Sequence, residues 1–274
     1  MSVILSPRTP GGKGLGLIES FRWDLKNNAF PAHDVIGAGT PPPRKSLADL
    51  VHVPPGQAFA DQGAAQSCEG WAQHQIVHVR SRVLGIAPIT PSPNAIYYQA
   101  RARRYGWDAI WDGGSNPHEA LSSLREVGIV RYADWPHTSA INACPPPDAY
   151  RKGADRDWLT YRWVLTGGQS RTNETVGLLA SGRPVHAALQ VDAGLEEWRA
   201  GFEPWRRTGP ILGGHAVAIV GYDTLANGQK VFVVANSWGP IHDNGFFLMS
   251  QEALESNETT YLSTCEIDPA KVPS

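Results

Sequence analysis

The chain has 274 residues, and a protein of this length buries roughly three quarters of the surface of its unfolded chain, enough for one large core or two lobes with a cleft between them. Its 24 Lys and Arg residues stand against 26 Asp and Glu, which gives a formal net charge of −2, and 18% of the residues are charged. Such a balance creates no field that would collect nucleic acid or an anionic membrane surface. We therefore expect neither as a partner.

The chain contains three cysteines, which allow at most one disulfide and so exclude a scaffold held together by several disulfides. Near the start, the apolar run Val3–Leu5 is broken by Pro7 and Pro10 before it reaches the length of a signal-peptide core. No apolar stretch approaches the roughly 18 residues that a membrane span requires. We therefore expect a cytoplasmic protein, with export by a route without a Sec signal as the alternative.

Residues 1–60 carry eight of the prolines and little periodicity. The exception is Leu17, Phe21 and Leu25, whose spacing predicts one or two helical turns. We expect residues 1–45 to form an extension or strap, for which a regulatory role is one interpretation, and residues 46–274 to form the main domain.

The chain between residues 60 and 150 is predicted to form a helical lobe. Apolar residues recur at helical intervals from Cys68 to Val83, and Ser67 stands where an N-cap is expected. Two further stretches have helical spacing with their own start or stop signals. These stretches are Ala95–Tyr105 and the segment from Asn116 and Pro117 to Gly128.

The pattern changes to strands in the second half, after a proline-rich crossing at 144–148 and a helix near 173–181. Apolar runs of strand length cover Val185–Val191, Ala216–Tyr222 and Val231–Ala235. The pair Asn227-Gly228 predicts a turn between the last two. A helical lobe followed by a β lobe at about 160–267 makes the predicted fold class α+β.

Three residues carry candidate chemistry. Cys68 begins a predicted helix, where unsatisfied backbone N–H groups and the helix dipole favour a thiolate, although most cysteines outside disulfides are simply small buried hydrophobes. His215 begins one strand of the predicted hairpin and Asn236 ends the other. Adjacent strands would place the imidazole and the amide side by side.

The segments around these residues resemble those of the papain-like cysteine peptidases. Gln62-Gly-Ala-Ala-Gln-Ser-Cys68 resembles the family's glutamine-to-cysteine segment, His215-Ala-Val-Ala-Ile-Val-Gly-Tyr its histidine segment, and Asn236-Ser-Trp-Gly its asparagine segment. Their order and wide separation suit the family. The resemblance covers about residues 45–267 and implies a two-lobed fold, with an antiparallel β-barrel-like lobe and the active-site cleft between the lobes.

The resemblance also implies roles for single residues. A thiolate of Cys68 paired with protonated His215 would attack a peptide carbonyl and form an acyl-enzyme. Asn236 would orient the imidazole, and Gln62 would help to stabilise the oxyanion. Trp238 would cover the bond between histidine and asparagine. The remaining substrate-binding positions are Gly113 and Gly114, which would pair with an extended substrate, and Asn116, Ala188 and Ala216, which would wall a pocket.

Several positions depart from the family pattern. The disulfide beside the nucleophile is missing, since its positions fall on Ala65 and Trp111, and its absence fits a reducing compartment. Glu69 replaces the usual aromatic residue, where a carboxylate would raise the thiol pKa or disfavour acidic residues after the cut. The loop 238–245 is one residue shorter than usual and lacks the second tryptophan. The usual cysteine three residues before Cys68 is absent, and in this respect the chain resembles bacterial and phage members of the family.

Other candidate sites are less well supported. His74 and His78 have the i, i+4 spacing of two metal ligands, but no third ligand is evident and an ordinary helix face is the better interpretation. No metal or organic cofactor is therefore predicted. Cys144 and Cys265 are expected to be buried thiols, and whether they pair stays open.

The predicted function is that of a cysteine endopeptidase acting on a protein or peptide substrate, with no prediction of the oligomeric state. Two alternatives remain: an acyltransferase or isopeptidase on the same scaffold, and a peptide-binding module that has lost turnover.

Overall fold

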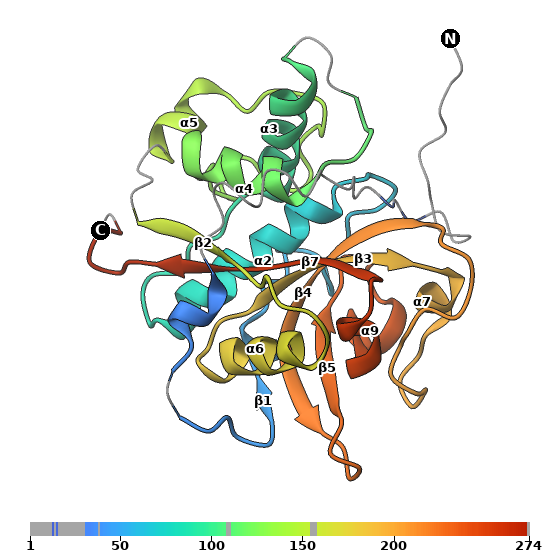
Figure 1. Ribbon diagram of the computed structural model, residues 1–274. Coiled ribbons are helices and arrows are strands. Elements are labelled where there is room, and N and C mark those ends of the chain that lie inside the picture. Colours follow the sequence, from blue (N-terminus) through green and yellow to red (C-terminus); the bar gives the residue numbers. More distant parts are fainter. Residues whose placement is uncertain are drawn as a thin grey trace.

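The computed structural model describes residues 13, 15, 31–37, 39–107, 111–153 and 158–272. Helices gather in one lobe and an antiparallel sheet forms the other, so that the two lobes follow each other along the chain (Figure 1). The predicted α+β, two-lobed fold is confirmed. Within the described residues, no helix is both long and apolar enough to cross a membrane.

The helices of the first lobe come from the chain between residues 68 and 152. They are α2 (Cys68–Val83), α3 (Pro93–Tyr105), α4 (Pro117–Glu126) and α5 (Pro147–Lys152). Every residue of α2 from Cys68 to Ser81 is buried. Because α2 packs against α3 and α4 on one side and against the sheet on the other, this central helix fixes the position of Cys68 relative to both lobes.

The starts of these helices differ in how they are capped. Ser67 occupies the N-cap position of α2, as predicted, but its side chain accepts no capping hydrogen bond. By contrast, Ser92 Oγ accepts from the Ala95 N–H, and the Asn116 side chain accepts from the N–H of Glu119. Burial between the lobes, rather than a cap, therefore holds the first turn of α2 in place.

The strands of the second lobe form one sheet in the order β2-β7-β3-β4-β5-β6, with β1 beside β4. All neighbours are antiparallel. The strands are β1 (Lys45–Ser46), β2 (Leu159–Trp163), β3 (Val185–Val191), β4 (Gly213–Thr224), β5 (Lys230–Ala235), β6 (Phe246–Ser250) and β7 (Thr259–Ile267). The shorter elements that accompany them are η1 (Ala32–Val35), η2 (Ala48–Leu50), α6 (Gly168–Ala180), α7 (Ala193–Glu197), α8 (Ile241–Asn244) and α9 (Gln251–Glu255).

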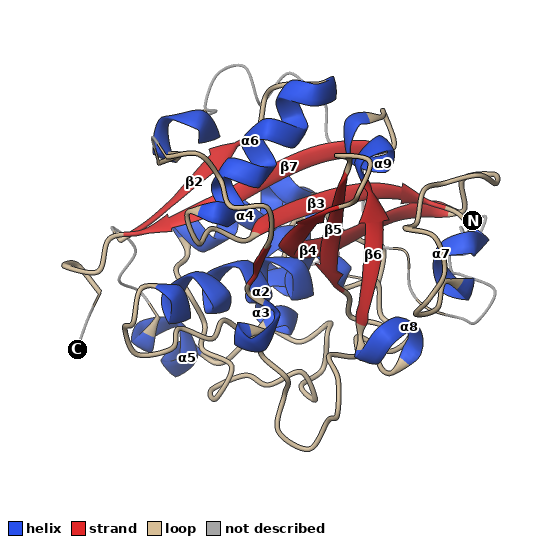
Figure 2. Ribbon diagram, turned by 90° about the horizontal axis from the view of Figure 1, so that it is seen from below, coloured by secondary structure: helices blue, strands red, loops and turns tan. Residues whose placement is uncertain are grey.

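The sheet separates two hydrophobic cores. Helices α6 and α9 cover one face and α2 lies against the other (Figure 2). Side chains alternate between the faces, as in any strand: Val217 and Ile219 of β4 join the core under α6, whereas Ala216 and Ala218 join the core against α2. Burial on both faces explains why these strands appear as continuous apolar runs.

The predictions for the second half were correct for β3, β4 and β5, and Gly228 of the predicted turn has φ +85°. The helix expected near 173–181 begins earlier, at Gly168. The predictions omitted β2, β6 and β7. Polar residues interrupt the apolar pattern of β2 and β7, whereas β6 is a run of only five residues. The turns expected at residues 17, 21 and 25 lie outside the described residues.

Residues 1–45 are described only in part, and the described residues contact the β lobe. Leu15 and Ala32 are buried in the core under α6. Strand β1 extends across the expected boundary at residue 45 and pairs with Gly221 and Tyr222 of β4. The part of the extension that the structure describes therefore packs with the main domain.

Candidate active site

His215 and Asn236 meet on the hairpin formed by β4 and β5. His215 belongs to β4, and Asn236 follows directly after the end of β5. The imidazole Nε2 lies 2.7 Å from the Asn236 Oδ1 atom, which also accepts a hydrogen bond of 2.8 Å from the Ser237 N–H. Since a backbone N–H only donates, this second bond identifies the atom facing the histidine as the amide oxygen.

The indole of Trp238 covers this pair. Its ring stacks on the His215 ring with centroids 4.3 Å apart and an interplanar angle of 26°, and both side chains are fully buried. Trp238 thus lies against the histidine of this pair, and its role in excluding water from the bond stays what the resemblance implies.

The other ring nitrogen of His215 is available for proton transfer. Nδ1 is buried and has no hydrogen-bond partner among the described residues. Burial lowers the pKa of His215 to about 4, although the hydrogen bond to Asn236 raises it. The imidazole is therefore uncharged at neutral pH, with its proton on Nε2 and a lone pair on Nδ1.

Cys68 is the first residue of α2 and is fully buried. Helix α2 packs against β4, and Cys68 belongs to the same buried cluster as Ala216, the neighbour of His215.

The three cysteines, all in the described part of the chain, form no disulfide. Cys144 is exposed, so the expectation that it is buried was wrong, whereas Cys265 is buried and burial raises its pKa to about 12.

Gln62 is hydrogen-bonded to the loop that carries Asn236. Its backbone N–H donates to the Ser237 carbonyl at 2.8 Å, and its side-chain oxygen accepts from the Ser237 hydroxyl at 2.6 Å. Its side-chain NH2 group donates to the Ala65 carbonyl at 2.7 Å, three residues before Cys68. The glutamine therefore connects the segment before α2 with the end of β5.

A comparison with known families agrees with this geometry. The description "Papain family cysteine protease" matches residues 112–270, more than half of the chain. The chain belongs to the papain family. The match covers His215 and Asn236 but not Cys68 or Gln62. The catalytic roles of all four residues stay predictions.

Two curated relatives and one solved structure are similar to the chain. Cathepsin B-like CP3 of Giardia intestinalis is 37% identical over 200 residues, 68% of this chain and 62% of the relative. Cathepsin B-like CP1 of the same organism is 30% identical over 197 residues, 68% of this chain and 61% of the relative. The chain thus spans less than two thirds of either relative's length. Xylellain, a cysteine protease from Xylella fastidiosa, shares the fold with a TM-score of 0.73 at 22% identity, over 97% of this chain and 99% of xylellain.

The two glycines predicted to bind substrate lie beside a hydrogen-bond network that the sequence did not reveal. The Gly114 N–H donates to the Tyr97 hydroxyl at 3.0 Å, and this hydroxyl donates to Asp112 at 2.7 Å. A Cβ at Gly113 would collide with the Trp111 indole. A substrate that accepts from the Gly114 N–H would have to replace the bond to Tyr97.

The predicted pocket residues are buried. Ala188 and Ala216 are directly opposite each other on β3 and β4, and the Asn116 side chain caps α4. A space lined partly by Ala216 and Asn236 has a volume of about 10 Å³, room for about one water molecule. The described residues around Ala216 therefore leave no preformed space for a substrate side chain there.

Glu69, the residue after Cys68, points into the protein interior. Its side chain is fully buried, with Oε2 at 2.9 Å from His186 Nε2 and Oε1 accepting from Gln73 at 2.9 Å. His186 belongs to β3, so this pair joins α2 to the sheet.

Histidines also gather away from the cleft, on α2. His52 Nδ1 lies 3.0 Å from His74 Nε2, and His78 contacts the Thr90 hydroxyl at 2.9 Å. Burial lowers the pKa of His74 to about 3 and that of His78 to about 4. In the part of the chain that the structure describes, no three His, Cys, Asp or Glu residues are arranged to hold a metal.

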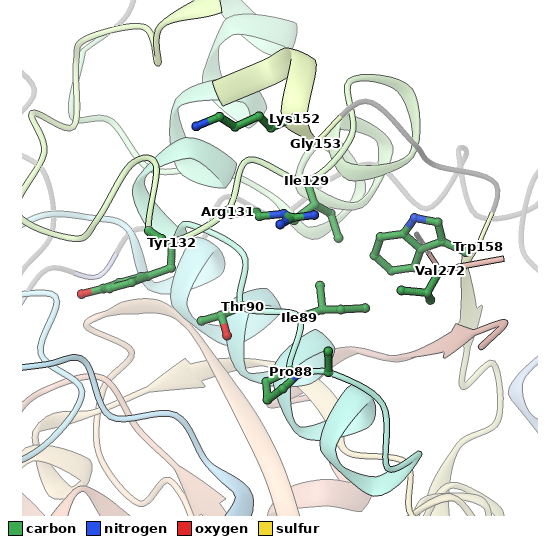
Figure 3. A pocket seen from close by; sticks show the side chains of 12 residues that line it. Pro88, Ile89, Thr90, Ile129, Arg131, Tyr132, Lys152, Gly153, Trp158 and Val272 are labelled. Atoms are coloured by element: carbon green, nitrogen blue, oxygen red, sulfur yellow. The ribbon is translucent and has the colours of Figure 1, made fainter. Parts of the chain in front are cut away.

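A separate cavity of about 320 Å³ lies at the helical lobe, and Ile89, Trp158 and Val272 surround part of it (Figure 3). Its lining comes from segments 87–90, 129–133 and 152–153 together with residues 158 and 272. None of the predicted site residues belongs to this lining. The cavity is therefore distinct from the candidate active site.

Proposed function

We propose that this chain is a cysteine peptidase whose nucleophile is the Cys68 thiol. The observation that carries the proposal is the tautomer of His215: Nε2 donates to Asn236, which leaves the lone pair on the buried Nδ1. A helix N-terminus favours the thiolate on Cys68. The residues therefore provide a nucleophile, a base and a group that orients the base.

In the reaction, Nδ1 of His215 takes the proton of the Cys68 thiol, and the resulting thiolate attacks the peptide carbonyl carbon. The C–N bond then breaks, the imidazolium gives this proton to the leaving amine, and a thioester remains. Water attacks the thioester with Nδ1 as the base, which releases the carboxylic acid and restores the thiol. The Gln62 amide and the Cys68 N–H are the proposed donors to the oxyanion in both halves.

Substrate binding rests on the same residues as in the sequence analysis. We keep Gly113 and Gly114 as the proposed backbone partners of an extended protein or peptide substrate, with Asn116, Ala188 and Ala216 beside them. The similarity to bacterial and phage members and the cytoplasmic location also stay predictions.

The test is covalent labelling of Cys68 with an epoxide inhibitor. Because Cys144 is exposed, the labelling is done in a Cys144→Ser background, which should keep full peptidase activity. We expect modification of Cys68 alone, loss of activity in Cys68→Ala, and slower labelling in His215→Ala. Activity that survives Cys68→Ala, or labelling that persists elsewhere, would show that the assignment is wrong.

We also propose that the N-terminal segment restrains the enzyme. Lys13 pairs with Asp61 at 3.2 Å, next to Gln62, and Leu15 is buried in the β-lobe core. Cys68 and His215 are both fully buried, and the N-terminal segment is the part of the chain that we propose to limit the access of substrate to them.

This proposal is tested by comparing the full chain with shortened variants that begin near residue 45 or at Pro31, the second of which keeps the buried Ala32. Leu15→Ala provides a variant of unchanged length. We expect higher peptidase activity in each. Equal activity in the full chain and in the variant beginning at Pro31 would refute the proposal.

A further inference from the structure

His242 continues the hydrogen-bond chain behind Asn236. Its Nδ1 lies 3.3 Å from Asn236 Nδ2, and its Nε2 lies 2.6 Å from the Leu195 carbonyl oxygen. The histidine is 8% exposed and Asn236 is 5% exposed. The chain of contacts therefore runs through buried side chains, from the backbone of α7 to the ring of His215.

The chemistry of these groups allows only one arrangement of protons for neutral imidazoles. The Leu195 carbonyl accepts only, so Nε2 of His242 carries the proton and Nδ1 is an acceptor. Nδ1 can then bond only to the NH2 side of Asn236. The amide oxygen consequently faces His215, whose Nε2 must donate and whose Nδ1 keeps the lone pair.

We propose that His242 is a positioning residue that fixes the amide orientation of Asn236 and, through it, the tautomer of His215. This inference rests on the proposed peptidase function and adds a residue to its machinery. His242 does not touch substrate; it acts through Asn236.

The backbone of His242 supports a specific role. It has φ 69° and ψ −138°, a conformation that costs a residue with a side chain free energy and persists only where surrounding contacts enforce it. Those contacts are aromatic: the ring centroids of Phe247, Trp238 and Trp198 lie 5.4, 5.9 and 6.0 Å away. The packing holds the ring where its two nitrogens reach Asn236 and Leu195.

The charge state also fits. Burial lowers the pKa of His242 to about 4, and the groups that act on it electrostatically are Arg199, which lowers the pKa, and Glu196, which raises it. At neutral pH the ring is uncharged, and an uncharged ring is what the acceptor at Nδ1 requires.

The test compares His242→Phe, which keeps an aromatic ring but removes both hydrogen bonds, with His242→Gln, whose amide can accept from Asn236 and donate to Leu195. His78→Phe is the matched control, because His78 is a similarly buried histidine (7% exposed) that contacts Thr90 and not Asn236. Each kcat is calculated from the concentration of Cys68 that reacts with the epoxide, so that misfolded protein does not lower the measured kcat.

We expect His242→Phe to lower kcat about tenfold with little change in KM. In metal sites, losing a residue that orients a ligand costs roughly 10- to 100-fold, and the expected effect is the lower end of that range. His242→Gln should recover most of the loss, and His78→Phe should change kcat less than about twofold. In an Asn236→Ala background, His242→Phe should have almost no further effect, since its action passes through Asn236.

The inference is overturned if His242→Phe keeps the parental kcat, if His242→Gln recovers none of the loss, or if the loss is equally large in the Asn236→Ala background. Each of these results leaves the proposed function intact as long as Cys68→Ala is inactive. An active Cys68→Ala variant would instead refute the proposed function itself.

Discussion

Gln66 and Asp112 are joined by two hydrogen bonds: the Gln66 N–H donates to Asp112 Oδ1 and the Gln66 side-chain amide donates to the Asp112 carbonyl, both at 2.9 Å. These residues directly follow Ala65 and Trp111, where the family's disulfide is missing. Hydrogen bonds thus connect the same two segments that the disulfide would join, and one of these segments leads to Cys68.

Replacing Asp112 should therefore loosen both segments. Asp112→Ala removes the acceptor of the Gln66 N–H and of the Tyr97 hydroxyl, and hydrogen bonds to charged groups are worth about 1.5 to 3 kcal/mol each. We expect a loss of about 3 kcal/mol in the free energy of unfolding, the lower end for two such bonds because Asp112 is half-buried, and a higher KM for peptide substrates. Urea denaturation followed by circular dichroism measures the loss.

Asp148→Ala is the matched control, since Asp148 is 73% exposed and, among the described residues, forms its ion pair with Arg151 three residues on. Its effect on the free energy of unfolding should stay within about 0.5 kcal/mol. An unchanged urea midpoint in Asp112→Ala would show that the two segments do not depend on this carboxylate.

The buried contact between Glu69 and His186 gives a second prediction. Removing one partner of a buried pair costs about 3 to 5 kcal/mol, whereas replacing both by apolar residues is often neutral. Glu69→Leu alone should therefore destabilise the protein by about this amount in urea denaturation, and Glu69→Leu with His186→Leu should recover most of the loss. A double variant that is destabilised by the sum of the Glu69→Leu and His186→Leu single effects would mean that the contact contributes no coupling.

Because Glu69 faces the sheet, Glu69→Gln should leave the preference for residues after the cut unchanged. Peptide libraries that vary those residues test this expectation. A gain in cleavage before Asp or Glu would place the Glu69 charge in the cleft after all.

The sequence predicted the elements whose pattern is local and strong. Helix α2 and strands β3, β4 and β5 have long uninterrupted spacings, and the hairpin of β4 and β5 brings His215 and Asn236 together at 2.7 Å. Strand β7 was missed because Thr259, Ser263 and Glu266 interrupt its apolar run. A segment with such irregularly placed polar residues becomes recognisable as a strand only when its neighbours are known.

The contacts that surround the candidate site join residues far apart in the chain. Gln66 and Asp112 are 46 residues apart, and Glu69 and His186 are 117 apart, so no local pattern indicates either pair. His242 had one signal: a histidine in a loop that is shorter than the family pattern. Its partner Leu195 lies 47 residues away, on a short helix that the sequence analysis did not predict.

A third prediction concerns Asn236 and the acid limit of activity. Burial lowers the pKa of His215 to about 4, and the bond to Asn236 opposes this shift. Since the neutral imidazole must accept the thiol proton, kcat/KM should be constant above this pKa and fall as the pH drops through about 4.

Asn236→Ala should lower kcat about a hundredfold, the lower end of what a positioned acid–base group contributes. It should also move the acid limb of the profile, the part where activity falls, to lower pH.

Initial rates with a peptide substrate between pH 3 and 8 provide the measurement. Asn173→Ala, on the exposed face of α6, is the control and should leave both the rate and the acid limb unchanged. An acid limb that moves to higher pH in Asn236→Ala would contradict the proposed role of the amide oxygen.

The last prediction is a loss of stability in acid that arises from the histidines of α2. Burial lowers the pKa of His74 to about 3 and that of His78 to about 4, from an ordinary value of 6.5. Below pH 6.5 the unfolded chain takes up protons at these positions and the folded protein does not. The free energy of unfolding therefore falls between pH 6.5 and about 4, by up to about 1.4 kcal/mol per pH unit for each histidine.

His74→Gln keeps a donor for the Pro91 carbonyl but cannot be protonated. The slope of unfolding free energy against pH should therefore decrease by the amount that corresponds to about one proton. His33→Gln, at a histidine whose side chain is 65% exposed, should leave the slope as it is. Urea denaturation at a series of pH values measures these slopes, and an unchanged slope in His74→Gln would mean that His74 is already protonated in the folded protein.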